Sequence, residues 1–301
     1  MEISSGLVKA TLKGHAPPPD GIATDRRGNY WATAAWDKTA RIWDARTYKQ
    51  LQAFNNEITN FTRLHFSPDG RRLLLATKDS LFIREVISGK IVHTLGGPLK
   101  PVEEAFSPDG KRLAVAFADG SVRIYDTGNW SSFIQVKKTS PTTGILQFNH
   151  NGSLLMTGDS GRGPVELWQA NDGSFRLQIG KEDEKRFWQA VFNPHDNRIL
   201  TSSNEIRDVA MIWDGETGKL LQHLKPVPNR MVLGQEASCV SFSPKGDRCF
   251  VATTKGVGKM YQASQGALLF NMAGHTGPLT GIAVNTLCHK ILTNGYQVSV
   301  L

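Results

Sequence analysis

Ser160 lies in the string Gly-Asp-Ser-Gly-Arg-Gly-Pro at residues 158–164, a setting that could serve nucleophilic chemistry. A serine hydroxyl attacks a carbonyl group near neutral pH only if a general base takes its proton, and a further group has to orient that base. Whether Ser160 is a nucleophile therefore depends on where such a base would come from.

The string is similar to the sequence around the nucleophile of chymotrypsin-like serine proteases, with one arginine inserted. Upstream, "WATAAWDK" at residues 31–38 resembles the stretch that carries their histidine. Trp36 stands where that histidine would be, and an indole cannot accept a proton from serine. We therefore predict no catalytic residue, and a hydrolase is the least favoured of the functions considered.

The composition indicates a folded protein that is neither exported nor inserted in a membrane. Of the 301 residues, 40% are hydrophobic and 9% are aromatic, which is enough for a packed core. The cysteines, Cys239, Cys249 and Cys288, form no Cys-x-x-Cys pair, which favours reduced thiols over disulfides or a metal site. The N-terminus does not resemble a signal peptide, and no apolar run reaches about 18 residues. We expect a cytoplasmic protein without metal or cofactor, treated as a monomer.

One phrase recurs along the chain: a phenylalanine, a cluster of turn-forming residues and a second apolar run. It reads "FSPDGRRLLLA" from Phe66, "FSPDGKRLAVA" from Phe106, "FNHNGSLLMTG" from Phe148, "FNPHDNRILTS" from Phe192 and "FSPKGDRCFVA" from Phe242, with a weaker copy from Ala23. Two apolar runs joined by Pro, Gly, Asn or Asp predict a strand, a tight turn and a strand.

A second phrase follows each copy at a nearly fixed distance, as in "ARIWDARTYK", "VRIYDTGNW" and "AMIWDGETGK". Its large residue recurs in steps of 41 to 48 residues, at Trp43, Arg84, Tyr125, Trp168, Trp213 and Tyr261. A period in the low forties with four strand-like runs is typical of one blade of a β-propeller. The chain is therefore predicted to be all-β, with four-stranded antiparallel blades.

These phrases resemble the WD-repeat family, whose Trp-Asp pair stands at Trp43-Asp44 and Trp213-Asp214 and whose Gly-His pair stands at Gly14-His15 and Gly274-His275. The resemblance covers essentially the whole chain, and the "SPDGKRL" wording is similar to that of prokaryotic members. It implies a platform that binds a protein or peptide on one rim, as a scaffold or as a regulatory or sensor module, without catalytic activity.

The family resemblance also implies a hydrogen-bonded structural relay in the first blade, formed by His15, Thr33, Asp37 and Trp43.

The alignment of the repeats also accounts for the protease-like string around Ser160. Thr33 lies five residues after Gly28, and Thr157 lies five residues after Gly152, so the two protease-like strings are copies of one strand-turn-strand element. Ser160 is therefore predicted to be a turn residue.

The two ends of the chain resemble two parts of one blade. Residues 6–15 match the fourth-strand segments that begin at Gly89 and Gly266, whereas the C-terminal residues supply three strands. We therefore predict a single domain over residues 1–301, a seven-bladed β-propeller whose last blade comprises residues 275–301 and is closed by the N-terminal strand at residues 6–13. Such a ring leaves no long sheet edge exposed.

Aromatic and arginine side chains, which dominate protein interfaces, mark one rim of this fold. We predict that a partner binds at Trp36, Arg186, Phe187 and Trp188, because Trp36 precedes a turn aspartate and the other three residues open the fifth blade. For Trp188, packing between blades is an equally open alternative.

The opposite rim is predicted to be basic, because the first-to-second strand turns carry Arg26, Arg27, Arg71, Arg72, Lys111 and Arg112 in a chain of net charge +8. Two interpretations stay open: a solvated rim that aids solubility, or a surface for nucleic acid, a ribosome or an acidic protein. No aromatic stacking platform accompanies these charges. A protein or peptide partner is therefore favoured, and a nucleic-acid- or ribosome-associated factor is the alternative.

Overall fold

The computed structural model describes residues 10–16, 19–54, 61–136, 144–160, 163–180, 187–203, 210–225, 237–272, 277, 279, 281–284, 291–294 and 299–300. Every regular element in these residues is a β-strand. The described segments accordingly include no helix that could cross a membrane. The prediction of an all-β protein with four-stranded antiparallel sheets is confirmed.

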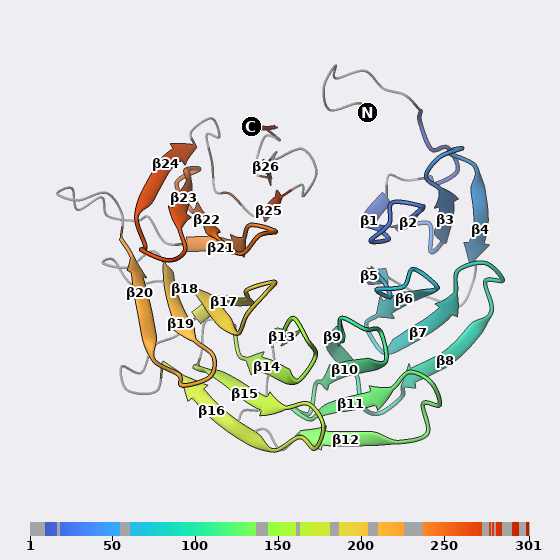
Figure 1. Ribbon diagram of the computed structural model, residues 1–301. Helices are drawn as coiled ribbons and strands as arrows, with labels where there is room; N and C mark the ends of the chain where they lie inside the picture. Colours follow the sequence, from blue (N-terminus) through green and yellow to red (C-terminus); the bar gives the residue numbers. More distant parts are fainter. Residues whose placement is uncertain are drawn as a thin grey trace. The chain divides into compact units, whose positions relative to one another are not determined.

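The chain divides into two compact units, which are Met1–Asp119 with Tyr125–Ser132, and Gly120–Ile124 with Phe133–Leu301. In each sheet, strands that follow one another in the sequence lie side by side (Figure 1). The first three sheets are β1 (Pro19–Thr24), β2 (Tyr30–Ala35), β3 (Ala40–Asp44) and β4 (Gln50–Phe54); β5 (Phe61–Phe66), β6 (Arg72–Thr77), β7 (Ser80–Glu85) and β8 (Ile91–Gly96); and β9 (Pro101–Phe106), β10 (Arg112–Phe117), β11 (Val122–Asp126) and β12 (Phe133–Val136).

Three further four-stranded sheets and one three-stranded sheet follow in the same manner. They are β13 (Ile145–Phe148), β14 (Leu154–Gly158), β15 (Val165–Gln169) and β16 (Phe175–Ile179); β17 (Phe187–Phe192), β18 (Arg198–Ser203), β19 (Ala210–Asp214) and β20 (Leu220–Leu224); β21 (Ala237–Phe242), β22 (Arg248–Thr253), β23 (Gly258–Gln262) and β24 (Leu268–Met272); and β25 (Gly281–Val284), β26 (Ile291–Asn294) and β27 (Ser299–Val300).

The recurring Ser-Pro-Asp-Gly phrase forms the tight turn between the first and second strands of a sheet. In the β5–β6 turn, the Ser67 hydroxyl donates to Asp69 Oδ1 at 2.6 Å and accepts the Arg72 N–H at 2.9 Å. Gly70 has a φ of 72°, in the left-handed region that favours glycine. The phrase therefore closes the hairpin by its own side chains, and its repetition sets the spacing of the sheets.

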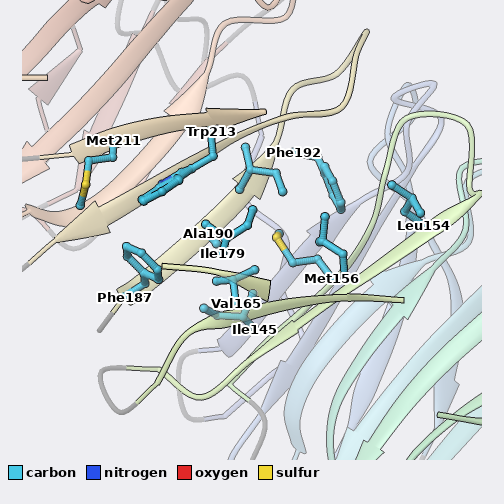
Figure 2. Packing of buried hydrophobic residues seen from close by; sticks show 12 residues of the cluster. Ile145, Leu154, Met156, Val165, Ile179, Phe187, Ala190, Phe192, Met211 and Trp213 are labelled. Carbon is cyan, nitrogen blue, oxygen red and sulfur yellow. The ribbon is translucent and has the colours of Figure 1, made fainter. Parts of the chain in front are cut away.

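Successive sheets within a unit pack face to face through apolar side chains. Figure 2 shows this between the β13–β16 and β17–β20 sheets, where Met156, Val165 and Ile179 form one cluster with Phe187 and Trp213. Equivalent clusters join the first sheet to the second, the second to the third, and the fifth to the sixth. Because both faces of the middle strands are covered, their sequences are continuous apolar runs instead of alternating ones.

The predicted last blade falls largely outside the described residues. Of residues 6–13, the first four are not described and residues 10–13 have no strand assignment. The β25–β27 sheet has three strands, as the C-terminal sequence predicts. The seven-bladed ring and its closure by the N-terminal strand stay predictions.

Candidate partner-binding surface

The structure brings His15, Thr33, Asp37 and Trp43 together in the first sheet. His15 Nε2 lies 2.8 Å from Thr33 Oγ1, and His15 Nδ1 lies 3.1 Å from Asp37 Oδ2. The Trp43 indole N–H donates to Thr33 Oγ1 at 2.9 Å. Since Thr33 Oγ1 accepts from Trp43, its own proton is directed to His15 Nε2, and the imidazole donates through Nδ1 to Asp37.

Asp37 also fixes the turn in which it lies. It accepts the Thr39 N–H at 3.0 Å, the Thr39 hydroxyl at 2.7 Å and the Ala16 N–H at 3.2 Å. Burial by itself would raise the pKa of Asp37, but the hydrogen bonds from Thr39, His15 and Ala16 outweigh it and lower that pKa to about 2. The carboxylate is therefore ionised at neutral pH, and its hydrogen bonds hold the turn to the chain segment before β1.

Trp36 occupies the exposed corner of this turn, between β2 and β3. The Lys38 N–H donates to the Ala35 carbonyl, and the Ala35 N–H donates to the Thr39 carbonyl, both at 3.1 Å. Trp36 is 69% exposed, whereas Ala34 and Ala35 beside it are buried. The sequence therefore places a large aromatic side chain in solvent on a backbone that the Asp37 network holds rigid.

The partner-binding predictions for residues 186–188 have three different outcomes. Arg186 lies outside the described residues. Phe187 is fully buried and packs edge-on against Trp213 at 5.9 Å between ring centroids, so the prediction that Phe187 contacts a partner is wrong. Trp188 is 50% exposed, and the strand is bulged between Phe187 and Ala190. Neighbouring side chains of a strand point to opposite faces, so the two aromatic residues have different surroundings.

Ser160 lies in the turn after β14 and is engaged with the backbone. Its hydroxyl donates to the Trp188 carbonyl at 2.8 Å. Because its proton already has an acceptor that cannot act as a base, this geometry gives Ser160 the role of tying a turn to β17.

The middle strands contain a pairing that our sequence analysis missed. The indole N–H groups of Trp168 and Trp213 donate to Thr157 and Thr201 at 2.9 Å, as Trp43 does to Thr33. Where the tryptophan is replaced, by Arg84, Tyr125 or Tyr261, the threonine is replaced as well, by Leu75, Val115 or Val251. A comparison of the repeats would have revealed this pairing, because the tryptophan and the threonine are present together or replaced together. The reason is that a buried N–H requires an acceptor.

The predicted basic residues lie at the end of the strands opposite Trp36. In each four-stranded sheet the turn after the third strand bonds the turn after the first, as where the Val86 N–H donates to the Arg71 carbonyl at 2.9 Å. Successive turns also touch, since Gly70 faces Asp25 and Gly110 faces Pro68. We call this surface of the first unit, formed by turn residues 25–29, 45–49, 67–71, 86–90, 107–111 and 127–132, the basic edge.

The six predicted basic side chains differ in exposure. Arg26, Arg27, Arg71 and Lys111 are exposed, whereas Arg72 and Arg112 are half-buried. Arg72 donates to the Thr127 carbonyl at 2.7 Å and lies 5.6 Å above the Trp130 ring. It therefore stabilises contacts between two sheets and presents less of its charge to solvent than its exposed neighbours do.

Comparison with known proteins shows similarity to WD-repeat proteins. The family model described as "WD domain, G-beta repeat" matches residues 6–44 and 89–126. The chain is 21% identical over 250 residues to autophagy-related protein 16 of Arabidopsis thaliana, with 82% of this chain and 48% of that protein covered. It is 23% identical over 310 residues to eukaryotic translation initiation factor 3 subunit I of Candida albicans, covering 91% and 86%. It is 28% identical over 160 residues to the COMPASS component SWD3 of Saccharomyces cerevisiae, covering 52% and 50%.

The chain thus spans about half the length of two of these relatives. The similarity to prokaryotic members stays a prediction. The repeated phrases, the four-stranded sheets, the Trp-Thr pairs and the matches to WD-repeat proteins agree, and together they support assignment of this chain to the WD-repeat family.

Proposed function

We propose that this protein is a non-catalytic platform that binds a protein or peptide partner through the edge of the first sheet that carries Trp36. The observation behind the proposal is the 69% exposed indole on a turn that Asp37 holds in place. Tryptophan is enriched among the few residues that supply most of the free energy of binding at protein interfaces. A rigid turn lowers the entropy lost on binding, because the side chain is already presented.

The relatives support a role in assemblies. Two of them are, by their names, a subunit of a translation initiation factor and a component of a complex. The family is generally one of protein-interaction scaffolds and complex components, which fits a chain whose conspicuous exposed side chain is an aromatic anchor instead of a reactive group.

The described chemistry favours binding over catalysis. Both ring nitrogens of His15 are engaged within the relay, so neither is available to a substrate. Burial raises the pKa of the Cys249 thiol to about 12, and the thiol therefore stays protonated and unreactive at neutral pH.

The proposal is tested by capturing partners from a native lysate with the tagged wild-type protein and with Trp36→Ala, followed by mass spectrometry. Ile87→Ala is the matched control, because Ile87 is 66% exposed but lies on the basic edge. We expect Trp36→Ala to weaken binding of the captured partner by about 2 kcal/mol, roughly 30-fold in Kd, and Ile87→Ala to bind as wild type. Capture of the same proteins with unchanged affinity by Trp36→Ala would contradict the proposal.

We further propose that the sheets form a seven-bladed ring closed by residues 6–13. The supporting observation is the face of the first sheet that bears Ile22, Trp31, Thr33 and Trp43, which lines an apolar pocket of about 540 Å³. The equivalent face of the second, third, fifth and sixth sheets packs against the preceding sheet. If residues 6–13 formed the fourth strand of the β25–β27 sheet, that sheet would pack against this face of the first sheet in the same way.

A further inference from the structure

The basic edge presents exposed cations that form no ion pair with the described residues. In the first sheet these are Arg26, Arg27, Arg46 and Lys49, and in the second and third sheets they are Arg71, Lys90 and Lys111. None of them forms an ion pair with any residue in the described ranges. Their positive charge is therefore directed to solvent.

Three aspartates of the same edge are engaged in hydrogen bonds within their own turns. Asp25 is buried and accepts the Tyr30 N–H at 2.7 Å, and Asp69 accepts the Ser67 hydroxyl at 2.6 Å. Asp109 is bound in the same manner as Asp69 in the next sheet. Asp25 is therefore withdrawn from the cations, whereas Asp69 and Asp109 are exposed and offset part of the charge of Arg71 and Lys111 without pairing with them.

The corresponding turns of the second unit carry fewer exposed cations. The residue that follows the turn glycine is Arg71 in the second sheet and Lys111 in the third, whereas it is Ser153 in the fourth sheet and Asp247 in the sixth. Arg198 pairs with Asp196 at 2.8 Å. The positive charge is therefore concentrated in the turns of the first unit.

We infer that the basic edge binds the phosphate backbone of a double-stranded nucleic acid without reading its bases. Guanidinium and ammonium groups on a row of adjoining turns suit a row of phosphates. Single-stranded nucleic acid would call for exposed rings on which bases stack. On this edge Trp130 is buried and Tyr48 is half-buried against Trp31, so neither offers a free ring face.

An acidic protein fits this edge less well. Protein interfaces add buried apolar anchors to their charges, and Ile87 is the one large apolar side chain exposed among the described residues of the turns that form the basic edge. The inference is also independent of the proposed partner surface, because Trp36 lies at the opposite end of the strands of the first sheet.

The experiment measures the anisotropy of a fluorescein-labelled 30-base-pair RNA duplex, and of a DNA duplex of the same sequence, titrated with the full-length protein at several KCl concentrations. The test variant is R27Q/R71Q/K111Q, and the control variant is K219Q/K245Q/R248Q, which removes as many exposed cations from the corresponding ends of the strands in the second unit. Thermal melting of both variants verifies that each is folded.

We expect the wild-type protein to bind with an affinity that falls steeply with salt as counterions are released. The test variant should bind about tenfold more weakly or worse at 100 mM KCl, with a shallower salt dependence, while the control variant and Trp36→Ala bind as wild type. The inference is overturned if no duplex binds at 50 mM KCl, if both triple variants lose affinity equally, or if a polyglutamate peptide displaces the duplex at equal charge. The last result would identify an acidic protein as the partner.

Discussion

At the scale of single residues, Ser160 shows how local contacts decide between two chemical roles. Its hydroxyl donates to the Trp188 carbonyl, and a carbonyl oxygen cannot take up the proton that a nucleophile must lose. We therefore expect a fluorophosphonate probe to leave the protein unlabelled under conditions that label a serine hydrolase completely. Stoichiometric labelling that disappears in Ser160→Ala would show that the serine is activated after all.

The lowered pKa of Asp37 predicts how the free energy of unfolding changes in acid. Its pKa in the folded protein is about 2, below the ordinary value of 3.8, so its ionised form stabilises the folded state. This contribution is complete above about pH 4 and is lost as the pH falls toward 2. We expect the free energy of unfolding of Asp37→Asn to lie below that of the wild type at pH 5, and the two values to converge near pH 2. A difference that stays constant over this range in urea titrations would exclude the ionised carboxylate as its source.

Residues 187 and 188 show what the sequence could not tell. The adjacent aromatics were both predicted to face a partner, yet Phe187 is buried and Trp188 is half exposed. Alternation along a strand requires that one of two neighbours points inward, but a bulge decides where the alternation shifts. The register from Phe187 to Ala190 depends on pairing with β18, which local sequence does not encode.

At the scale of the elements, the Trp-Thr pairs predict a stability effect. Trp168 is buried, and Thr157 provides the acceptor for its indole N–H. Thr157→Val should cost about 1 to 3 kcal/mol, because the N–H is left buried without a partner. Adding Trp168→Phe should recover part of that loss, since it removes the donor. If urea unfolding shows that the two substitutions simply add, the hydrogen bond is not what couples them.

The repeat phrases predicted the hairpins well because they contain their own turn chemistry. The Ser67 and Asp69 bonds lie within six residues, so composition and spacing suffice to locate them. The relay from His15 to Trp43 could be expected only through the family resemblance, because it joins three separate segments. The burial of Asp25 could not be predicted, since charge counting treats every carboxylate as exposed.

At the scale of the whole molecule, the two ends of the strands in the first unit have different chemistry. One end presents Trp36 on a fixed turn, and the other presents arginines and lysines that lack ion partners among the described residues. Salt screens an exposed charge strongly but has little effect on a desolvated indole. Salt dependence therefore separates the two surfaces, and a protein partner and a nucleic acid could bind at the same time.

The proposed ring closure makes a prediction about Ile22. It pairs with Thr33 as Leu64 pairs with Leu75 and Val240 with Val251, yet Ile22 is 73% exposed whereas Leu64 and Val240 are buried. If residues 6–13 and the C-terminal sheet cover this face, Ile22→Asp should cost about 2 to 3 kcal/mol, since burial of one such side chain contributes roughly 1.5 to 3 kcal/mol. Ile87→Asp, on an exposed turn, should change stability by less than about 0.5 kcal/mol.

Deletion of residues 1–12 provides the second half of this test. The deletion should lower the melting temperature, because it removes the proposed fourth strand and leaves a sheet edge bare. It should also shrink the cost of Ile22→Asp, since the cover over Ile22 would be incomplete and the two changes would no longer add. Equal, small costs for Ile22→Asp and Ile87→Asp in the full-length protein, together with an unchanged melting temperature after the deletion, would show that the N-terminal segment does not close the fold.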